Sequence, residues 1–89
     1  NEITLEAWVN VKSFGSYAQI YRSNPLSLIL AFQPEGGTGW SVSFGANIGG
    51  GYNELDVSIQ TSDFLNKWVH LAATYDGSTK KIFKDGVLI

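Results

Sequence analysis

The segment Lys67–Ile89, KWVHLAATYDGSTKKIFKDGVLI, constrains the fold more than any other part of the chain. Asp76-Gly77 and Asp85-Gly86 punctuate it nine residues apart, each between residues typical of β-strands. Asp-Gly in such a setting is a strong hairpin signal, because the turn needs residues that tolerate a positive φ. The segment therefore predicts an antiparallel meander in which Asp76 and Asp85 are turn residues. Its last strand has barely begun when the sequence stops, so we expect an incomplete meander.

Alternation of apolar and polar residues, the signature of a half-buried strand, recurs through the rest of the chain. The predicted strands are Glu2–Val11, Tyr17–Ser23, Leu26–Gln33, Gly39–Gly45, Glu54–Gln60, Trp68–Tyr75, Lys80–Lys84 and Val87–Ile89. Between them, the predicted connections are a turn at Asn24-Pro25, a flexible glycine-rich loop at Ala46–Asn53 and one short helical or 3₁₀ turn within Thr61–Asn66. Many short strands without a sustained helical period predict a β sandwich or barrel.

The same alternation predicts which side chains face the core. The inward sets are Trp40, Val42 and Phe44 on one strand, Leu55, Val57 and Ile59 on another, and Ala18 with Ile20 on a third. Ser41 and Ser43 are predicted to point outward, and Trp68, like Trp40, is predicted to lie in the core. Trp8 breaks the alternation of its strand, which indicates that the second face of that strand is partly covered.

Composition excludes several classes of function. The net charge is −2 and the lysines and arginines form no basic cluster, which argues against nucleic acid as a partner. The absence of cysteine removes disulfides, thiol catalysis and cysteine-ligated zinc. No apolar stretch approaches the roughly 18 residues of a membrane span, so we expect no membrane insertion. The 89 residues suffice for one small domain, and the lack of an initial methionine leads us to expect a mature, excised or partial piece.

Two segments resemble the LamG-like jelly-roll family, within the concanavalin A-like lectin/glucanase fold. Residues 3–9, ITLEAWV, are similar to the family's opening strand, and residues 68–77 with 81–87 are similar to its late Trp-x-His strand and hairpin. The resemblance implies an all-β, antiparallel two-sheet jelly-roll sandwich over residues 1–89, as a single domain or its N-terminal portion. Family members usually continue past this hairpin, so we expect an incomplete sandwich. Its open sheet edges would be filled by strand addition from a missing segment or a neighbouring chain, or by homo-oligomerisation.

Glu54 and Asp56 form the motif that comes nearest to catalytic machinery. Glycoside hydrolases that share this fold carry a Glu-apolar-Asp-apolar motif that continues to a second Glu. Hydrolysis needs two carboxylates, one as nucleophile and one as acid, but Ser, Ile and Gln occupy positions 58–60. A polar strand face is therefore the better interpretation, and we expect no enzymatic activity. His70 matches the family's Trp-x-His position, where we expect a hydrogen-bonded, partly buried structural side chain.

Residue types near the glycine-rich stretch indicate binding. Carbohydrate recognition uses an aromatic platform with planar polar groups, and Tyr52, Asn53, Glu54 and Asp56 supply these types. They are the predicted ligand-binding residues. Tyr17 and Tyr21, on the face opposite Ile20, offer an alternative platform.

Calcium is the one candidate cofactor. It takes six to eight oxygen ligands, and the nearest oxygen-rich cluster is Asn47, Asn53, Glu54 and Asp56. The sequence thus predicts a non-enzymatic binding or adhesion module, extracellular or at the cell surface, for a glycan or an extracellular protein. The alternative is a structural subunit of an extracellular fibre or sheath, assembled through open sheet edges.

Overall fold

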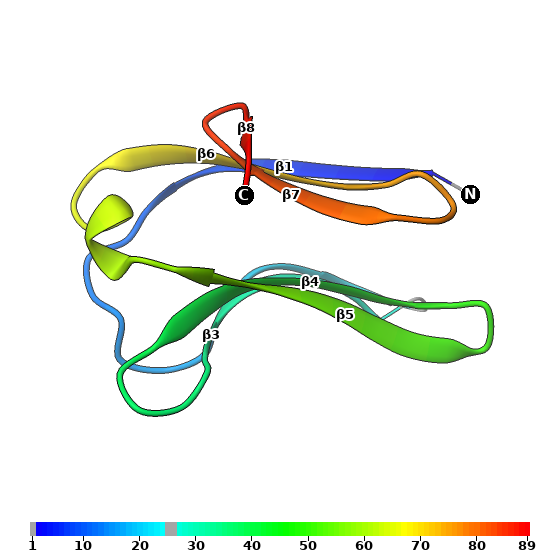
Figure 1. Ribbon diagram of the computed structural model, residues 1–89, viewed down its shortest axis with the longest axis horizontal. Helices are drawn as coiled ribbons and strands as arrows, with labels where there is room; N and C mark the ends of the chain where they lie inside the picture. The colour runs from blue at the N-terminus through cyan, green and yellow to red at the C-terminus, as the bar shows by residue number, and fades with distance from the viewer. Residues whose placement is uncertain (1, 25–26) are drawn as a thin grey trace. The chain divides into compact units, whose positions relative to one another are not determined.

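A computed structural model describes residues 2–24 and 27–89 of the chain (Figure 1). The strands are β1 (Ile3–Asn10), β2 (Ala18–Ser23), β3 (Leu28–Pro34), β4 (Trp40–Ile48), β5 (Gly51–Ile59), β6 (Trp68–Tyr75), β7 (Lys80–Lys84) and β8 (Val87–Leu88), with one 3₁₀ turn, η1 (Thr61–Asp63). They form two antiparallel sheets of four strands, in the orders β1-β6-β7-β8 and β2-β3-β4-β5. The prediction of an all-β, antiparallel two-sheet fold is confirmed. Within the described residues, no helix has the length and hydrophobicity needed to cross a membrane.

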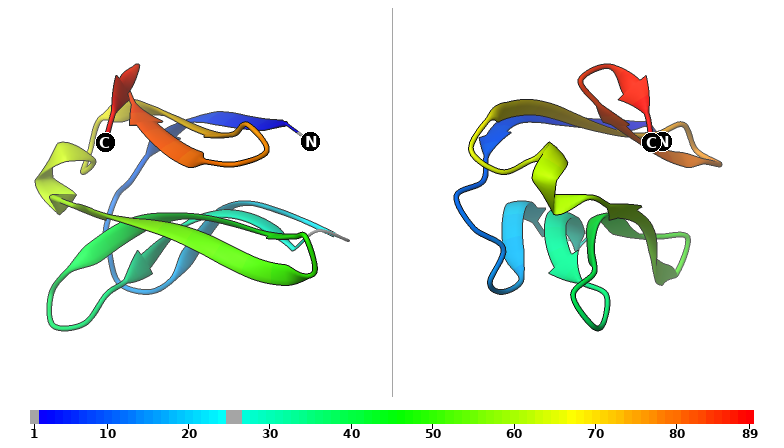
Figure 2. Two further views of the ribbon diagram at one scale, coloured as in Figure 1. Left: turned by 45° about the vertical axis from the view of Figure 1, so that its right-hand side comes forward. Right: turned by 60° about the vertical axis from the view of Figure 1, so that its left-hand side comes forward.

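The chain divides into two compact units, each built around one sheet. One unit takes in the residues up to Gly15 together with Gln60–Ile89, and the other is Ser16–Ile59. In the first unit β6 lies between β1 and β7, so the beginning and the end of the chain share a sheet (Figure 2). The predicted Trp-x-His strand and its hairpin are confirmed as β6 and β7, with pairs such as Leu71 opposite Lys84 and Tyr75 opposite Lys80.

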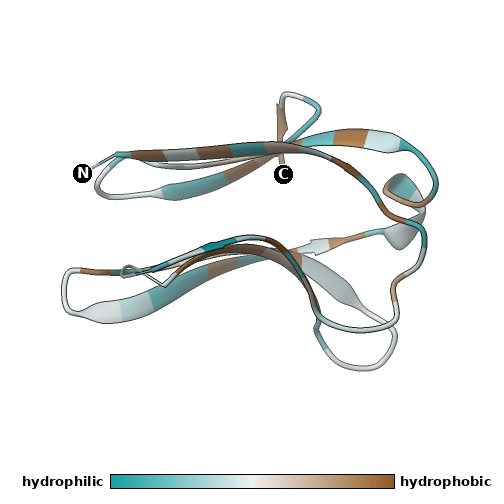
Figure 3. Ribbon diagram, turned by 180° about the vertical axis from the view of Figure 1, so that it is seen from behind, coloured by the Kyte–Doolittle hydropathy of each residue, from teal (hydrophilic) through white to brown (hydrophobic). Residues whose placement is uncertain are grey.

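Side chains of alternate residues form the core of the first unit. Val69, Leu71 and Ala73 of β6 are buried together with Ile82 of β7, and Phe64 follows η1 and is 1% exposed. Alternation along β1 is visible in Figure 3 as hydrophobic and hydrophilic bands in turn. Because side chains two residues apart share a face, Trp68 falls in phase with His70 rather than with Val69. The prediction that Trp68 lies in the core is therefore wrong, since its side chain is 66% exposed.

The second unit is a meander in which each strand pairs with the next. Leu30, Phe32, Trp40, Val42 and Phe44 are all buried, which confirms the predicted inward set of β4, Trp40 included. On β5 the apolar residues are half-buried and the polar residues exposed, as predicted. The predicted turn at Asn24-Pro25 and the predicted strand start at Leu26 fall partly outside the described residues.

The glycine-rich connection between β4 and β5 is much shorter than predicted. Instead of a flexible loop over Ala46–Asn53, β4 continues to Ile48 and β5 begins at Gly51. Gly49 and Gly50 form the two-residue turn, with φ values of 70° and 92°. Positive φ at both central positions is the requirement of a type I′ hairpin, which only glycine and a few polar residues meet easily. The glycines therefore tighten a long hairpin, and the prediction of a loop is wrong.

An irregularity in β2 overturns the predicted inward pair Ala18 and Ile20. The register with β3 shifts between Gln19 and Tyr21, so that Gln19 lies opposite Ala31 and Tyr21 opposite Leu30. A bulge of this kind inserts a residue and interrupts the alternation of side chains. Ala18 is accordingly exposed and Ile20 only half-buried. The interruption also removes the regular alternation on which a shared platform of Tyr17 and Tyr21 depends.

Candidate functional site

One face of the β2-β3-β4-β5 sheet carries a row of polar side chains, which we call the polar face. Its members come from β3, β4 and β5: Gln33, Ser41, Ser43, Gly45, Tyr52, Glu54, Asp56 and Ser58. Strand register brings them together, because Ser43 lies opposite Asp56, Gly45 opposite Glu54, and Ser41 opposite both Gln33 and Ser58. Directly opposed residues of an antiparallel pair share a face and are close enough for their side chains to interact.

The side-chain amide of Gln33 is the centre of this face. Its Nε2 donates to Ser43 Oγ at 2.8 Å, to Glu54 Oε2 at 2.6 Å and to Asp56 Oδ1 at 3.1 Å. The amide thus connects residues of β4 and β5 from its place on β3. Ser41 and Ser43, predicted to point outward, are each only 1% exposed: Ser43 accepts from the Gln33 amide, and Ser41 donates to the Gln33 carbonyl. The two serines do lie on the face opposite Val42, as their alternation predicts.

Tyr52 lies at one end of the polar face, and its phenol ring packs against the backbone of Gly45. Its hydroxyl donates to Glu54 Oε1 at 2.7 Å, and burial together with this bond raises the pKa of Tyr52 above its ordinary value. A Cβ at position 45 would overlap the Tyr52 hydroxyl and would lie 2.6 Å from its Cζ atom. Glycine at position 45 is therefore what allows the phenol ring to lie against the sheet beside Glu54.

Replacing Gly45 with alanine should displace Tyr52 while leaving the sheet intact. The added methyl group meets the far end of an exposed side chain, which can swing away, so the expected loss of stability is about 0.5–1.5 kcal/mol, the worth of one hydrogen bond. The pKa of Tyr52 should then fall toward its ordinary value. NMR titration of labelled tyrosine measures this pKa. Gly15→Ala is the matched control, because a Cβ there meets nothing within 4 Å; an unchanged Tyr52 titration in the Gly45→Ala variant would contradict the proposed contact.

Asp56 is held in its ionised form. Burial by itself raises the pKa of the Asp56 carboxyl, but the combined influence of the adjoining Glu54 carboxyl, the Ser43 hydroxyl and the Gln33 amide lowers the pKa below the ordinary value. Hydrogen bonds to the charged form of a carboxyl favour that form. Each carboxylate offers about four lone-pair positions, and those of Glu54 accept one bond on each oxygen, from Tyr52 and from Gln33. Acceptor positions therefore remain for a ligand.

Glu35 adds a third carboxylate to the polar face from the loop after β3. Both of its carboxylate oxygens accept hydrogen bonds from Ser58 Oγ, at 2.8 and 2.9 Å. Sequence reasoning missed Glu35 and Gln33 as site residues, because each is about 20 residues from its partners on β5. One sequence signal could have pointed to Gln33. The strand that ends there is followed by two more predicted strands with alternating polar residues, which an antiparallel meander would place on the same face.

The structure brings together three of the four predicted ligand-binding residues. Tyr52, Glu54 and Asp56 lie on one face of β5, whereas Asn53 has the opposite phase, with Leu55. Asn53 lies opposite Ala46, and Asn47 lies opposite Tyr52. Because opposed residues share a face, Asn47 joins Glu54 and Asp56 on the polar face, and Asn53 alone of the predicted calcium set of Asn47, Asn53, Glu54 and Asp56 lies on the other face.

Hydrogen bonds on the polar face occupy carboxylate oxygens that a calcium ion would need. A Gln33 N–H group, which cannot coordinate a cation, points at both Glu54 and Asp56. Within the part of the chain that the structure describes, no three acidic, histidine or cysteine side chains gather closely enough to hold a metal ion. Calcium binding stays a prediction, and we derive no role for the ion.

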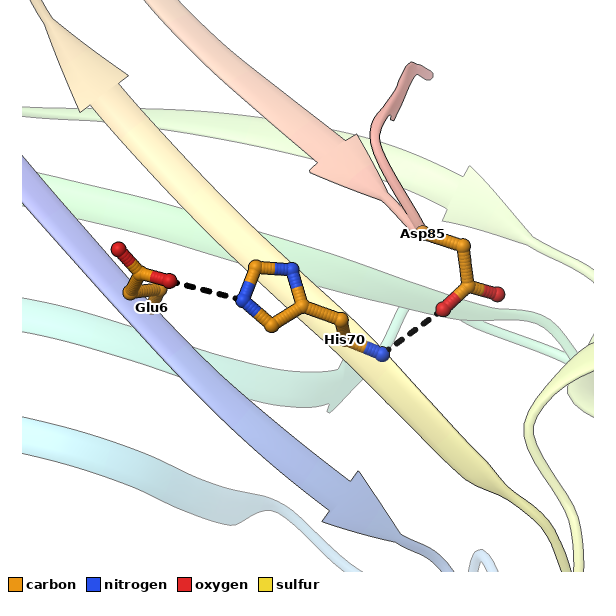
Figure 4. A network of polar contacts seen from close by, with 3 residues as sticks. All are labelled: Glu6, His70 and Asp85. Carbon is orange, nitrogen blue, oxygen red and sulfur yellow. Dashed lines mark hydrogen bonds and ion pairs between the residues drawn. The ribbon is translucent and has the colours of Figure 1, made fainter.

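A second polar cluster surrounds His70 in the other unit (Figure 4). Its Nε2 lies 2.9 Å from Glu6 Oε1, and its side chain is 25% exposed, which confirms the expected hydrogen-bonded, partly buried histidine. The backbone N–H of His70 donates to Asp85 Oδ1 at 2.9 Å, while the Asp85 N–H donates to the His70 carbonyl at 2.8 Å. Asp85 has a φ of 50° at the β7–β8 turn, and Asp76 accepts from the N–H groups of Ser78 and Thr79. Both aspartates are turn residues, as predicted.

Replacing Asp85 should destabilise the β7–β8 turn, more with alanine than with asparagine. The hydrogen bond from the His70 N–H lowers the pKa of Asp85 below its ordinary value, and alanine also tolerates the positive φ less well than Asn or Asp. A depressed pKa contributes stability above the unfolded-state pKa, and that contribution is lost as the pH falls through the folded-state pKa. Thermal melts should therefore show lower melting temperatures for Asp85→Ala than for Asp85→Asn at pH 7. The difference between wild type and Asp85→Asn should shrink at pH 3; equal differences at both pH values would contradict the role of the charge.

Comparison with known proteins agrees with the architecture of the chain. A laminin G family model, described as the concanavalin A-like lectin/glucanases superfamily, matches residues 1–89. Neither a search of curated proteins nor a search of solved structures found a match. The two antiparallel sheets of this all-β chain are consistent with the sandwich of this superfamily. The family match extends over the whole chain and agrees with its all-β topology, so the chain belongs to the concanavalin A-like lectin/glucanases superfamily.

Proposed function

We propose that this chain is a non-enzymatic, extracellular binding module that recognises neutral glycans through its polar face. Members of its family often bind carbohydrates or proteins, and domains of this type are typically extracellular. The observation that carries the proposal is the Gln33 amide, which fixes the carboxylates of Glu54 and Asp56 in place from a neighbouring strand. Planar amide and carboxylate groups with open acceptor positions are suited to the hydroxyl groups of a sugar, and their fixed geometry reduces the entropy lost on binding.

The charge and the aromatic ring of this face favour a neutral sugar. Glu35, Glu54 and Asp56 are exposed carboxylates, which would repel uronic or sialic acids. Tyr52 is 44% exposed, so part of its ring is available to the apolar C–H face of a pyranose.

The ionised state of Asp56 does not suit the acid of a glycosidase. The acid of a glycosidase needs a raised pKa, whereas the pKa of Asp56 is lowered by its hydrogen bonds. Ser58 stands where a further carboxylate of the glycosidase motif would be expected, and it donates to Glu35.

A glycan array tests the proposal directly. The protein should bind neutral glycans, and calorimetry with the strongest of them should show affinity reduced about tenfold or more in Glu54→Gln, because a hydrogen bond to a charged group is worth about 1.5–3 kcal/mol. Glu2→Gln, an exposed carboxylate of the other unit, is the matched control.

Repeating the titration with calcium and with chelator tests the predicted calcium ion. Absence of glycan binding, or equal affinities for both variants, would overturn the proposal. Release of sugar products that Glu54→Gln abolishes would overturn its non-enzymatic part.

The position of β1 favours a second function, that of a structural subunit. β1 ends the strand order of its sheet and pairs with β6 along its full length from Ile3 to Asn10. The other edge of such a strand is a template for pairing with another chain. Light scattering across a dilution series separates the two functions: a concentration-dependent oligomer or filament favours the structural subunit, and a stable monomer favours the binding module.

A further inference from the structure

Two tryptophans and two polar side chains alternate at one end of the β1–β6 pair. Trp8 of β1 lies opposite His70 of β6, and Asn10 lies opposite Trp68. All four share the face of the sheet that is turned away from the buried Val69 and Leu71. The indoles occupy one diagonal of this arrangement and the polar groups the other. We call these four residues the aromatic quartet.

The indoles of the quartet are far more accessible than the third tryptophan of the chain. Trp8 is 65% and Trp68 is 66% exposed, whereas Trp40 is 9% exposed. A tryptophan buries about 150–250 Å² when it is covered, so two neighbouring exposed indoles leave a large apolar area in water. Single exposed apolar residues need no explanation, but contiguous ones mark interaction sites.

Polar groups at fixed positions accompany the indoles. The ring of His70 meets the ring of Trp8 edge-on, with centroids 5.1 Å apart and an interplanar angle of 61°. Glu6, whose side chain is 64% exposed, orients His70 through the 2.9 Å contact. Asn10 Oδ1 is shielded from solvent and accepts no hydrogen bond within the described residues. An acceptor left in this state is unfavourable by about 1–3 kcal/mol.

We propose that the aromatic quartet is a second saccharide-binding site, a platform for a neutral β-1,4-linked glycan chain. Such chains are flat ribbons whose pyranose rings expose C–H groups on their faces and hydroxyls at their edges. The C–H faces stack on the indoles of Trp8 and Trp68, and the hydroxyls reach His70 and Glu6. The Glu6 carboxylate beside the quartet disfavours acidic glycans. The site belongs to a different sheet from the polar face and does not depend on it.

The test uses cellohexaose and chitohexaose as neutral probes and a galacturonic acid hexamer as the acidic control. A neutral hexamer should protect the two exposed tryptophans from acrylamide quenching and shift their indole N–H resonances, while the buried Trp40 is unaffected. In the Glu54→Gln background, which removes binding at the polar face, Trp8→Ala and Trp68→Ala should each weaken binding about tenfold, and the double tryptophan variant should abolish it. Tyr21→Ala, an exposed aromatic residue of the other sheet, is the matched control and should bind as wild type does. Glu6→Gln should weaken binding less and should shift the His70 ring resonances, the signature of a positioning residue.

Three results would overturn the proposal. The first is the absence of binding for both neutral hexamers at millimolar concentration. The second is binding to the Glu54→Gln protein that the added double tryptophan substitution leaves unchanged, which would place the sugar outside the quartet. The third is a dimer, seen by sedimentation, that the double variant dissolves, because the quartet would then be an interface between copies of this chain. Loss of glycan binding in Glu54→Gln bears only on the polar face, so the two proposals can fail separately.

Discussion

Phe44→Ala is expected to lower the free energy of unfolding by about 3–5 kcal/mol, the range for deleting a buried phenylalanine ring. Phe44 is 0% exposed on the central strand β4, where it lies opposite Leu30 on one side and Leu55 on the other. The substitution removes the apolar contacts of the ring and leaves a cavity. Small domains are stable by only about 5–15 kcal/mol, so much of the variant should be unfolded at low urea concentration. Urea titration followed by circular dichroism measures the loss.

Two control variants identify the cause of that loss. Phe44→Leu keeps most of the apolar volume and should lose less than about 1.5 kcal/mol. Tyr21→Ala removes an aromatic ring that is 44% exposed and should change stability less than Phe44→Ala does. If Phe44→Ala lost no more than Tyr21→Ala, the residue would not belong to the core of its unit.

Gln33→Leu is expected to disconnect the polar face and to destabilise the chain by about 1–3 kcal/mol. The substitution removes the N–H donor from Ser43, Glu54 and Asp56 and leaves two carboxylates beside each other. Without that donor the pKa of Asp56 should rise, because the amide favours the ionised carboxylate. Carboxyl-carbon NMR titration measures the pKa, and urea titration measures the stability. Glycan affinity at the polar face should fall with them.

The dependence of stability on pH provides the sharper readout for this variant. A carboxyl with a depressed pKa stabilises the fold above its unfolded-state pKa, and this contribution disappears as the pH falls through the folded-state value. Wild type should therefore lose more stability between pH 7 and pH 3 than Gln33→Leu does. Gln19→Leu, on β2 opposite Ala31, is the matched control and should behave as wild type. An equal loss for wild type and Gln33→Leu would contradict the role of the amide.

Much of the secondary structure could be predicted from local pattern, because the period of two and the Asp-Gly turns act over a few residues. β6 and β7 were predicted with the bounds that the structure has, and the exposed and covered sides of β5 follow from its alternation. The failures have local physical reasons. Glycines at positions 49 and 50 are compatible both with a flexible loop and with a tight type I′ turn. The bulge in β2 has no recognisable sequence signature in the residues around Ile20. Trp68 is of a residue type common in cores, but Val69 and Leu71 occupy the buried face of β6, so Trp68 lies on the opposite, exposed face.

The sequence by itself determined the fold class, the strands and the carboxylate pair of β5, since these depend on residue type and on spacing within one strand. Only the tertiary structure decided which side chains meet across strands. Register placed Gln33 between Glu54 and Asp56, laid Tyr52 over Gly45, and set Trp8 diagonally to Trp68. Register is fixed by hydrogen bonds and packing between segments far apart in the chain, and a slip of one residue would send every side chain to the other face. The partners of a site built across strands are therefore absent from any local pattern.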